Sequence, residues 1–99
     1  MSASTTETAT PLATAVEVTD DTLTVDLSDA RTVSVPLTWY PRLLHATSEE
    51  RAKWELIAQG EGIHWPDVDE DISVAALIAG RPSGETAASL QRWLAARKA

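Results

Sequence analysis

The chain has 99 residues, 43% of them hydrophobic, and carries a formal net charge of −7 with no cysteine. A chain of this length supports one small core, so we expect a single globular domain rather than two domains or a disordered chain. The lack of cysteine excludes disulfides and thiolate metal sites, and the short, charge-broken apolar runs exclude a membrane-spanning segment. The N-terminus lacks the basic start and apolar core of a secretory signal, so we expect a cytoplasmic protein.

The charge is unevenly divided along the chain. Residues 1–80 hold fourteen acidic and four basic side chains, whereas residues 81–99 hold four basic side chains and one acidic one. An acidic body repels phosphate backbones, so we expect no direct contact with nucleic acid, and no membrane partner. The basic end is expected to lie against the acidic body of its own chain or of a second copy.

Residues 1–13 are Ser, Thr and Ala with a single charge, and they predict a mobile leader. The single domain then covers residues 14–99, with a core at 16–80 and a C-terminal helix at 85–97.

Apolar and polar side chains alternate between Ala15 and Leu37. Asp20-Asp21 and the run Ser28–Arg31 interrupt this alternation where turns would lie. The pattern predicts a three-stranded antiparallel meander with one buried face and one solvated face. The buried face would hold Val16, Val18, Leu23, Val25, Leu27, Val33, Val35 and Leu37. Pro36 lacks an amide hydrogen, so it should end the third strand or lie on an edge.

Two short helices are expected next. Thr38 is predicted to cap the first helix, with Pro41 in its first turn. Thr47 and Glu50 have the spacing of a capping box, which predicts the start of a second helix that ends near Trp54.

Residues 55–65 allow two interpretations. Leu56 to Ala58 and Ile63 to Trp65 could pair as a hairpin around the turn 59–62, or the second helix could continue to Gln59 and stop at Gly60. Both interpretations include a short strand at 63–65, which Pro66 would end.

The rest of the chain predicts an acidic loop followed by two helices. Ser73 is expected to cap a helix over residues 74–79 that stops at Gly80. The terminal helix carries a narrow apolar stripe of Ala87, Leu90, Trp93 and Leu94. The expected fold class is α+β: a three-stranded antiparallel meander, short helices, a further short strand or hairpin, and a C-terminal helix. We expect helices, the C-terminal one included, to cover one face of the sheet.

Three stretches carry a family resemblance. They are Trp39-Tyr40-Pro41-Arg42-Leu43, Gly62-Ile63-His64-Trp65-Pro66 and Asp69-Glu70-Asp71. Over roughly Val16 to Gly80 the chain resembles the bacterial family called domain of unknown function 2442. The resemblance implies a small α+β domain with no established enzymatic activity. It also implies a product of a compact operon, encoded beside another small protein and suspected of an antitoxin-like role.

The densest chemistry of the chain lies in the stretch from Gly62 to Asp71. Asp67, Asp69 and Asp71 have the spacing of the first calcium ligands, but Ile72 and Ile78 stand where a calcium loop needs Gly and Glu. His64 could act as a general base poised by Asp69 or Glu70, yet no nucleophile accompanies it. We therefore favour a solvated acidic turn and a structural histidine bonded to a carboxylate or carbonyl, with no catalytic residue, metal or cofactor.

Arginine and tryptophan are expected to serve the structure. Arg42 and Arg51 should hold the acidic loop in place through bidentate pairing. Trp39 and Trp54 are predicted to lie in the core, whereas Trp65 should lie partly exposed in a groove.

The function predicted from the sequence is a non-catalytic protein-interaction module, the antitoxin-like or regulatory member of an operon pair. Its partner would be a protein encoded by a neighbouring gene. The contact residues would be Ile63, His64, Trp65, Asp67, Asp69, Glu70, Asp71, Leu90, Trp93 and Leu94. One alternative is a metal-binding or hydrolytic protein that uses His64 with Asp67, Asp69 and Asp71. Another is a homodimeric structural domain in which Leu90, Trp93 and Leu94 pack across a two-fold axis.

Overall fold

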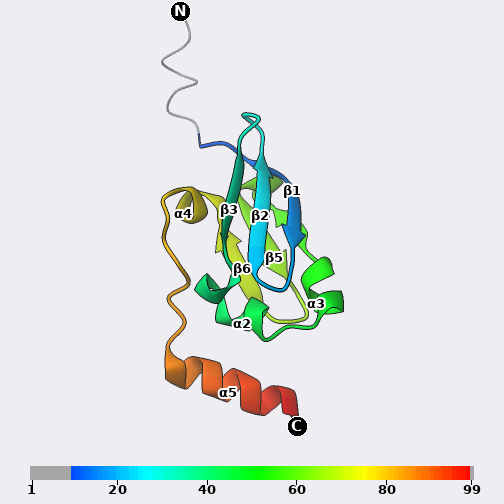
Figure 1. Cartoon of the computed structure of the whole chain (residues 1–99), viewed down its shortest axis with the longest axis vertical. Coiled ribbons are helices and arrows are strands. Elements are labelled where there is room, and N and C mark those ends of the chain that lie inside the picture. Colours follow the sequence, from blue (N-terminus) through cyan, green and yellow to red (C-terminus); the bar gives the residue numbers. More distant parts are fainter. Residues whose placement is uncertain (1–9, 99) are drawn as a thin grey trace, which may run out of the picture.

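The computed structural model describes residues 10–98 and contains two three-stranded antiparallel sheets, five short helical segments and a longer C-terminal helix (Figure 1). The α+β class predicted from the sequence is confirmed. Of the predicted leader, residues 1–9 lie outside the described part of the chain. Ala13 already begins the first strand and is buried. No helix within residues 10–98 is both long and apolar enough to cross a membrane.

The first sheet is the predicted meander. It consists of β1 (Ala13–Val18), β2 (Thr22–Leu27) and β3 (Thr32–Pro36) in the order β1-β2-β3. Val18 pairs with Leu23, so Asp20-Asp21 forms the tight turn between β1 and β2. The second turn closes through a hydrogen bond from the Leu27 amide to the Arg31 carbonyl. Pro36 ends β3 as predicted.

Alternation decides which side of the first sheet is buried. Leu23, Val25, Leu27 and Val35 are buried, whereas Val16, Val18 and Val33 pack against the core from its margin. On the outer face the hydroxyls of Thr24 and Ser34 lie 3.0 Å apart across the β2–β3 pair. The single buried face is therefore confirmed.

The segment after the meander differs from the prediction in its cap. Leu37–Trp39 forms one 3₁₀ turn (η1), and α2 spans Pro41–Leu44 with Pro41 at its first position. The residue at the N-cap of α2 is Tyr40, and no side chain caps it. Thr38 instead lies inside η1, because the chain turns immediately after Pro36, so the predicted cap is wrong.

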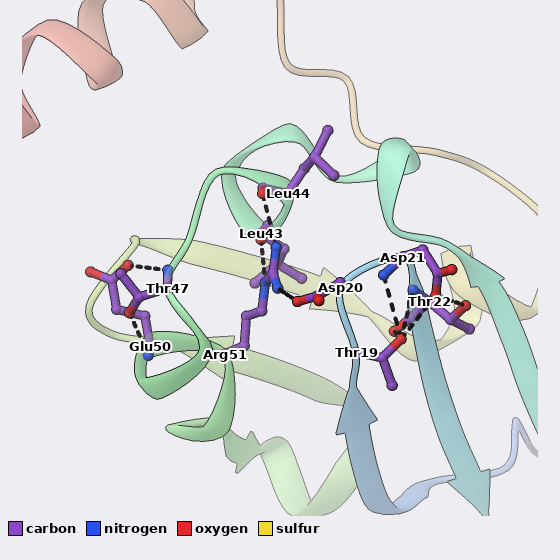
Figure 2. Close-up of polar contacts among 9 residues, drawn as sticks. All are labelled: Thr19, Asp20, Asp21, Thr22, Leu43, Leu44, Thr47, Glu50 and Arg51. Atoms are coloured by element: carbon purple, nitrogen blue, oxygen red, sulfur yellow. Dashed lines mark hydrogen bonds and ion pairs between the residues drawn. The ribbon is translucent and has the colours of Figure 1, made fainter.

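Helix α3 (Ser48–Ala52) begins at the predicted capping box. The Thr47 hydroxyl accepts the Glu50 amide at 3.1 Å, and the Glu50 carboxylate accepts the Thr47 amide at 2.8 Å (Figure 2). The helix ends two residues before Trp54, because the chain then enters a strand.

The second sheet resolves the open question about residues 55–65 in favour of the hairpin. β4 (Glu55–Ile57) pairs antiparallel with β5 (Gly62–Trp65), and a short 3₁₀ turn, η2 (Ala58–Gly60), connects them. Gly60 has φ +102°, and a Cβ atom there would lie 2.7 Å from the Ala13 carbonyl oxygen. Glycine is therefore required where this turn meets the start of β1.

A third strand of this sheet, β6 (Glu70–Ser73), occupies part of the predicted acidic loop. It pairs antiparallel with β5, which gives the order β4-β5-β6. The inner faces of the two sheets, which lie one behind the other (Figure 1), contribute to one core that includes Val25, Ile63 and Ile72. The expectation that helices cover the first sheet is wrong, because a second sheet supplies that layer.

The last two helices differ in their relation to the core. α4 (Val74–Ile78) begins at Ser73, whose hydroxyl accepts the Ala76 amide, and Gly80 follows it with φ +76°, as predicted. α5 (Ala87–Lys98) follows a segment without regular structure and lies beyond the end of the body that carries α2 (Figure 1). It therefore does not pack on a sheet face, contrary to the prediction.

Arg51 connects several of these elements, and its buried guanidinium has partners on three sides (Figure 2). It donates to the carbonyls of Leu43 and Leu44, at 2.9 Å each, and to the carboxylate of Asp20 at 2.9 Å. The backbone carbonyl of Arg51 accepts the indole N–H of Trp65 at 3.1 Å. The prediction that Arg51 holds the acidic loop is thus wrong: its partners lie on α2 and on the β1–β2 turn.

Replacing Arg51 with lysine tests this connection. Lysine keeps the charge but cannot donate to three separate acceptors from a planar fork. We expect Arg51→Lys to lower the free energy of unfolding by about 2 kcal/mol, measured by urea denaturation. Arg31→Lys is the matched control, since Arg31 is exposed and pairs only within its own turn. Equal stability of the two variants would contradict the role assigned to Arg51.

Candidate functional site

His64 lies on the outer face of the second sheet, between Glu55 of β4 and Asp71 of β6. Its Nδ1 is hydrogen-bonded to a carboxylate oxygen of Asp71, and this bond raises the pKa of His64. The predicted bond of a structural histidine to a carboxylate is confirmed, and the carboxylate is that of Asp71. The general-base alternative named Asp69 or Glu70 instead. Because the His64–Asp71 pair is formed across two strands, it also holds the register of β5 and β6.

The predicted acidic loop is divided between solvent and core. Asp67, Asp69 and Asp71 are exposed, and Lys53 pairs with Asp67 at 3.4 Å. Glu70 is only 8% exposed, because it occupies an inward position of β6 opposite Trp65. A strand alternates its side chains, so the successive acids Glu70 and Asp71 point to opposite faces. Only the exposed carboxylates can form a surface for a partner.

The alternative of a metal centre finds no support in this arrangement. In the part of the chain that the structure describes, no three His, Asp or Glu side chains come together as a metal site would require. The structure pairs His64 with Asp71, while Asp67 pairs with Lys53.

A second group of polar side chains lies where β6 meets α2. Burial raises the pKa of Glu70 to about 7, against the opposing effect of the nearby Arg42. Burial and the charge of Glu70 also raise the pKa of Tyr40, whose buried hydroxyl has no hydrogen-bond partner within residues 10–98. Glu70 is therefore a titratable group inside the core, and the attraction of Arg42 does not offset the cost of burying its charged form.

Arg42 connects this group to the C-terminal helix. Its Nε and Nη2 donate to the two carboxylate oxygens of Glu85 at 2.6 and 3.2 Å, and its Nη1 donates to the Asp69 carbonyl at 3.1 Å. The prediction that Arg42 holds the acidic segment is confirmed at Asp69. The guanidinium groups of Arg42 and Arg97 also lie over the Trp93 ring, 5.4 and 4.6 Å from its centroid.

The basic end of the chain lies against its own acidic body, one of the two placements expected from the charges. Arg97 donates to both carboxylate oxygens of Glu50, at 3.1 and 2.8 Å. These contacts leave Leu90, Trp93 and Leu94 partly buried. Cation–π and ion-pair contacts, rather than a wide apolar face, hold α5 in place.

Three of the predicted contact residues, Ile63, Trp65 and Glu70, are buried and are not available to a partner. Ile63 and Trp65 are fully buried, since both point inward from the central strand β5. The prediction that Trp65 lies partly exposed in a groove is therefore wrong. Involvement of the other named residues in partner binding stays a prediction.

The sequence analysis missed the exposed edge of the second sheet. All three residues of β4 are exposed, and among residues 10–98 the exposed large hydrophobic residues are Leu44, Leu56 and Ile57. A hollow of about 270 Å³ lies beside this strand, with Ile57, Gly62 and Ile72 among its lining residues. The residue pattern does not predict this exposed edge, because Leu56 and Ile57 would be ordinary core residues in either a helix or a strand.

Comparison with known proteins identifies the family. A family described as "Protein of unknown function (DUF2442)" matches residues 13–83. The chain belongs to the DUF2442 family. The match contains both sheets and the helices α2, α3 and α4, whereas α5 lies outside it. The resemblance noted in the sequence is thus confirmed.

Two solved structures share the DUF2442 chain's fold. The crystal structure of a protein of unknown function from Rhodospirillum rubrum is 27% identical with a TM-score of 0.66, and the match covers 83% of this chain and 99% of that one. The solution NMR structure of an uncharacterized protein from Chromobacterium violaceum is 20% identical with a TM-score of 0.64, over 96% of this chain and 82% of that one. Comparison with curated proteins gives no match.

The burial of Glu70 predicts a pH-dependent stability. The folded state holds the Glu70 proton more tightly than the unfolded chain, so stability falls as pH rises from about 4.5 to about 7 and then levels off. Glu70→Gln removes this dependence. Solvent partly screens the charge of Glu70. We therefore expect the free energy of unfolding of the variant to exceed that of the natural chain by about 1–2 kcal/mol at pH 8 and by much less at pH 5, measured by thermal unfolding at both values. An equal difference at the two pH values would contradict the buried, titrating Glu70.

The Arg42–Glu85 pair predicts how α5 is held. Glu85→Gln weakens a charge-assisted contact that is mostly shielded from solvent. We therefore expect the free energy of opening of α5 to fall by about 1–2 kcal/mol. Hydrogen exchange of the α5 amides should become about tenfold faster, while exchange in β2 and β5 stays unchanged. Glu17→Gln, at an exposed position of β1, is the control. Unchanged exchange in α5 would show that the pair does not hold the helix.

Proposed function

We propose that this DUF2442 chain is a non-catalytic protein-interaction module, the antitoxin-like or regulatory member of a pair encoded by neighbouring genes. The observation that carries the proposal is the exposed edge strand β4, which holds two of the three large exposed hydrophobic residues within residues 10–98. Unpaired edge strands with exposed apolar side chains are common docking sites for other chains.

The contact surface of this proposal includes the exposed carboxylates next to β4. Glu55 lies on β4 itself, and Asp71 lies in the same cross-strand row beyond His64. Carboxylates around an apolar strip favour a basic partner and speed its association. Asp67 and Asp69 extend the same negative surface past the end of β5.

The homodimer alternative is less well supported by the contacts. A two-fold interface through Leu90, Trp93 and Leu94 would use a stripe that already lies against its own chain, with Arg42 and Arg97 over Trp93. Such a dimer would require α5 to leave its position.

Capture of partners from cells of the native host tests the proposal. We expect the tagged full-length chain to enrich one specific protein, and Ile57→Ser to reduce its recovery about tenfold, because one buried aliphatic side chain contributes about 1.5 kcal/mol or more. Leu44→Ser is the matched control, since Leu44 is 37% exposed and Ile57 is 40% exposed. The proposal fails if no protein is enriched, or if both variants lose it equally.

A further inference from the structure

The hollow beside β4 has a specific structural origin. Ile57, Gly62 and Ser73 lie in one row across the three strands of the second sheet, and this row points outward. Gly62 contributes no side chain to the centre of the row, and it is buried beneath the side chain of Ile57. A Cβ atom at Gly62 would lie 3.0 Å from Ile57 Cγ1, so Ile57 occupies the space over Gly62 and forms one wall of the hollow.

The hollow is apolar inside and acidic at its rim. Ile57, Gly62 and Ile72 are among its lining residues, although the side chain of Ile72 lies in the core. Glu61 and Asp71 supply carboxylates, that of Asp71 being bonded to His64, and no Lys or Arg is among the lining residues. A second hollow of about 390 Å³ shares Glu61 and Ser73 with it and extends toward Leu12. The two hollows are adjacent because they share these residues, and the depression that consists of both suits an extended occupant better than a compact one.

On the basis of the proposed function, we infer that this depression binds a short extended segment of a partner protein in which an aliphatic residue is flanked by Lys or Arg. The aliphatic side chain enters the hollow beside Ile57, and the flanking cations lie near Glu61 and Asp71. Complementary charge is the reason for this choice, since the rim is acidic and residues 1–80 carry ten more acids than bases.

The chain's own segments fit this chemistry less well. Residues 1–9 include Glu7 and no Lys or Arg. Of the basic residues at the C-terminal end, Arg97 is bound to Glu50 and lies over Trp93. The occupant is therefore expected to come from another protein.

Capped synthetic peptides test this inference on the full-length chain. We expect Arg-Lys-Ile-Lys-Arg to bind with a Kd of about 1 mM and to shift the amide resonances of Ile57, Gly62 and Ile72. Arg-Lys-Ser-Lys-Arg should bind about tenfold more weakly, because it lacks the aliphatic anchor. Glu-Asp-Ile-Asp-Glu should not bind, and added salt should weaken the basic peptide.

Two variants locate the binding. Gly62→Ala displaces Ile57 from its position over Gly62 and so reshapes the hollow without a change of charge, and Glu61→Gln removes one rim carboxylate. Each variant should therefore weaken the peptide at least about threefold. Glu17→Gln, which removes an exposed carboxylate from β1, is the charge control and should bind normally.

The outcomes separate this inference from the proposed function. If a partner is captured through Ile57 but none of the peptides binds, the interaction module stands and the cationic segment is wrong. If the basic peptide binds as expected but no partner is captured, the site is supported and the interaction module is not. Light scattering that shows a dimer lost in Gly62→Ala would assign the depression to a second copy and overturn the inference.

Discussion

The fold depends on the buried guanidinium of Arg51. A charge in that position must be paired, and Arg51 finds its acceptors at the end of α2 and on the β1–β2 turn, while its own carbonyl accepts the Trp65 indole. The helices α2 and α3, the strand β5 and the β1–β2 turn are thereby held in one arrangement. Trp65 is buried because it lies inside this arrangement, which is why it is absent from the surface that the sequence suggested.

Packing of the two sheets then determines which polar groups face solvent. Both sheets bury their inner faces in a common core, so the outer face of the second sheet stays open. In β6, Glu70 is directed inward and Asp71 outward, although they are neighbours in sequence. The same alternation that isolates Glu70 beside Tyr40 places the carboxylate of Asp71 next to the hollow at Gly62. The burial of one acid and the exposure of the next thus have a single cause.

Helix α5 lies outside the part of the chain that the family match covers. The family match ends at Ser83, before the helix begins. Its attachment to the core depends on the Arg42–Glu85 and Arg97–Glu50 pairs and on Trp93 beneath two guanidinium groups. Ion pairs of this kind are weaker than a packed apolar face, so α5 should open before either sheet does.

The sequence by itself determined the local elements of this protein. Alternation between Ala15 and Leu37 specified the meander, and the Thr47–Glu50 spacing, Pro36 and Gly80 specified where elements begin or end. Each of these signals acts within a few residues. Only the tertiary structure decided that Glu-Asp-Ile-Ser forms the strand β6, since two acids disfavour a strand until β5 provides a pairing partner. It likewise decided the partners of Arg51, the burial of Trp65 and the exposure of Leu56 and Ile57, because burial depends on which distant segments pack together.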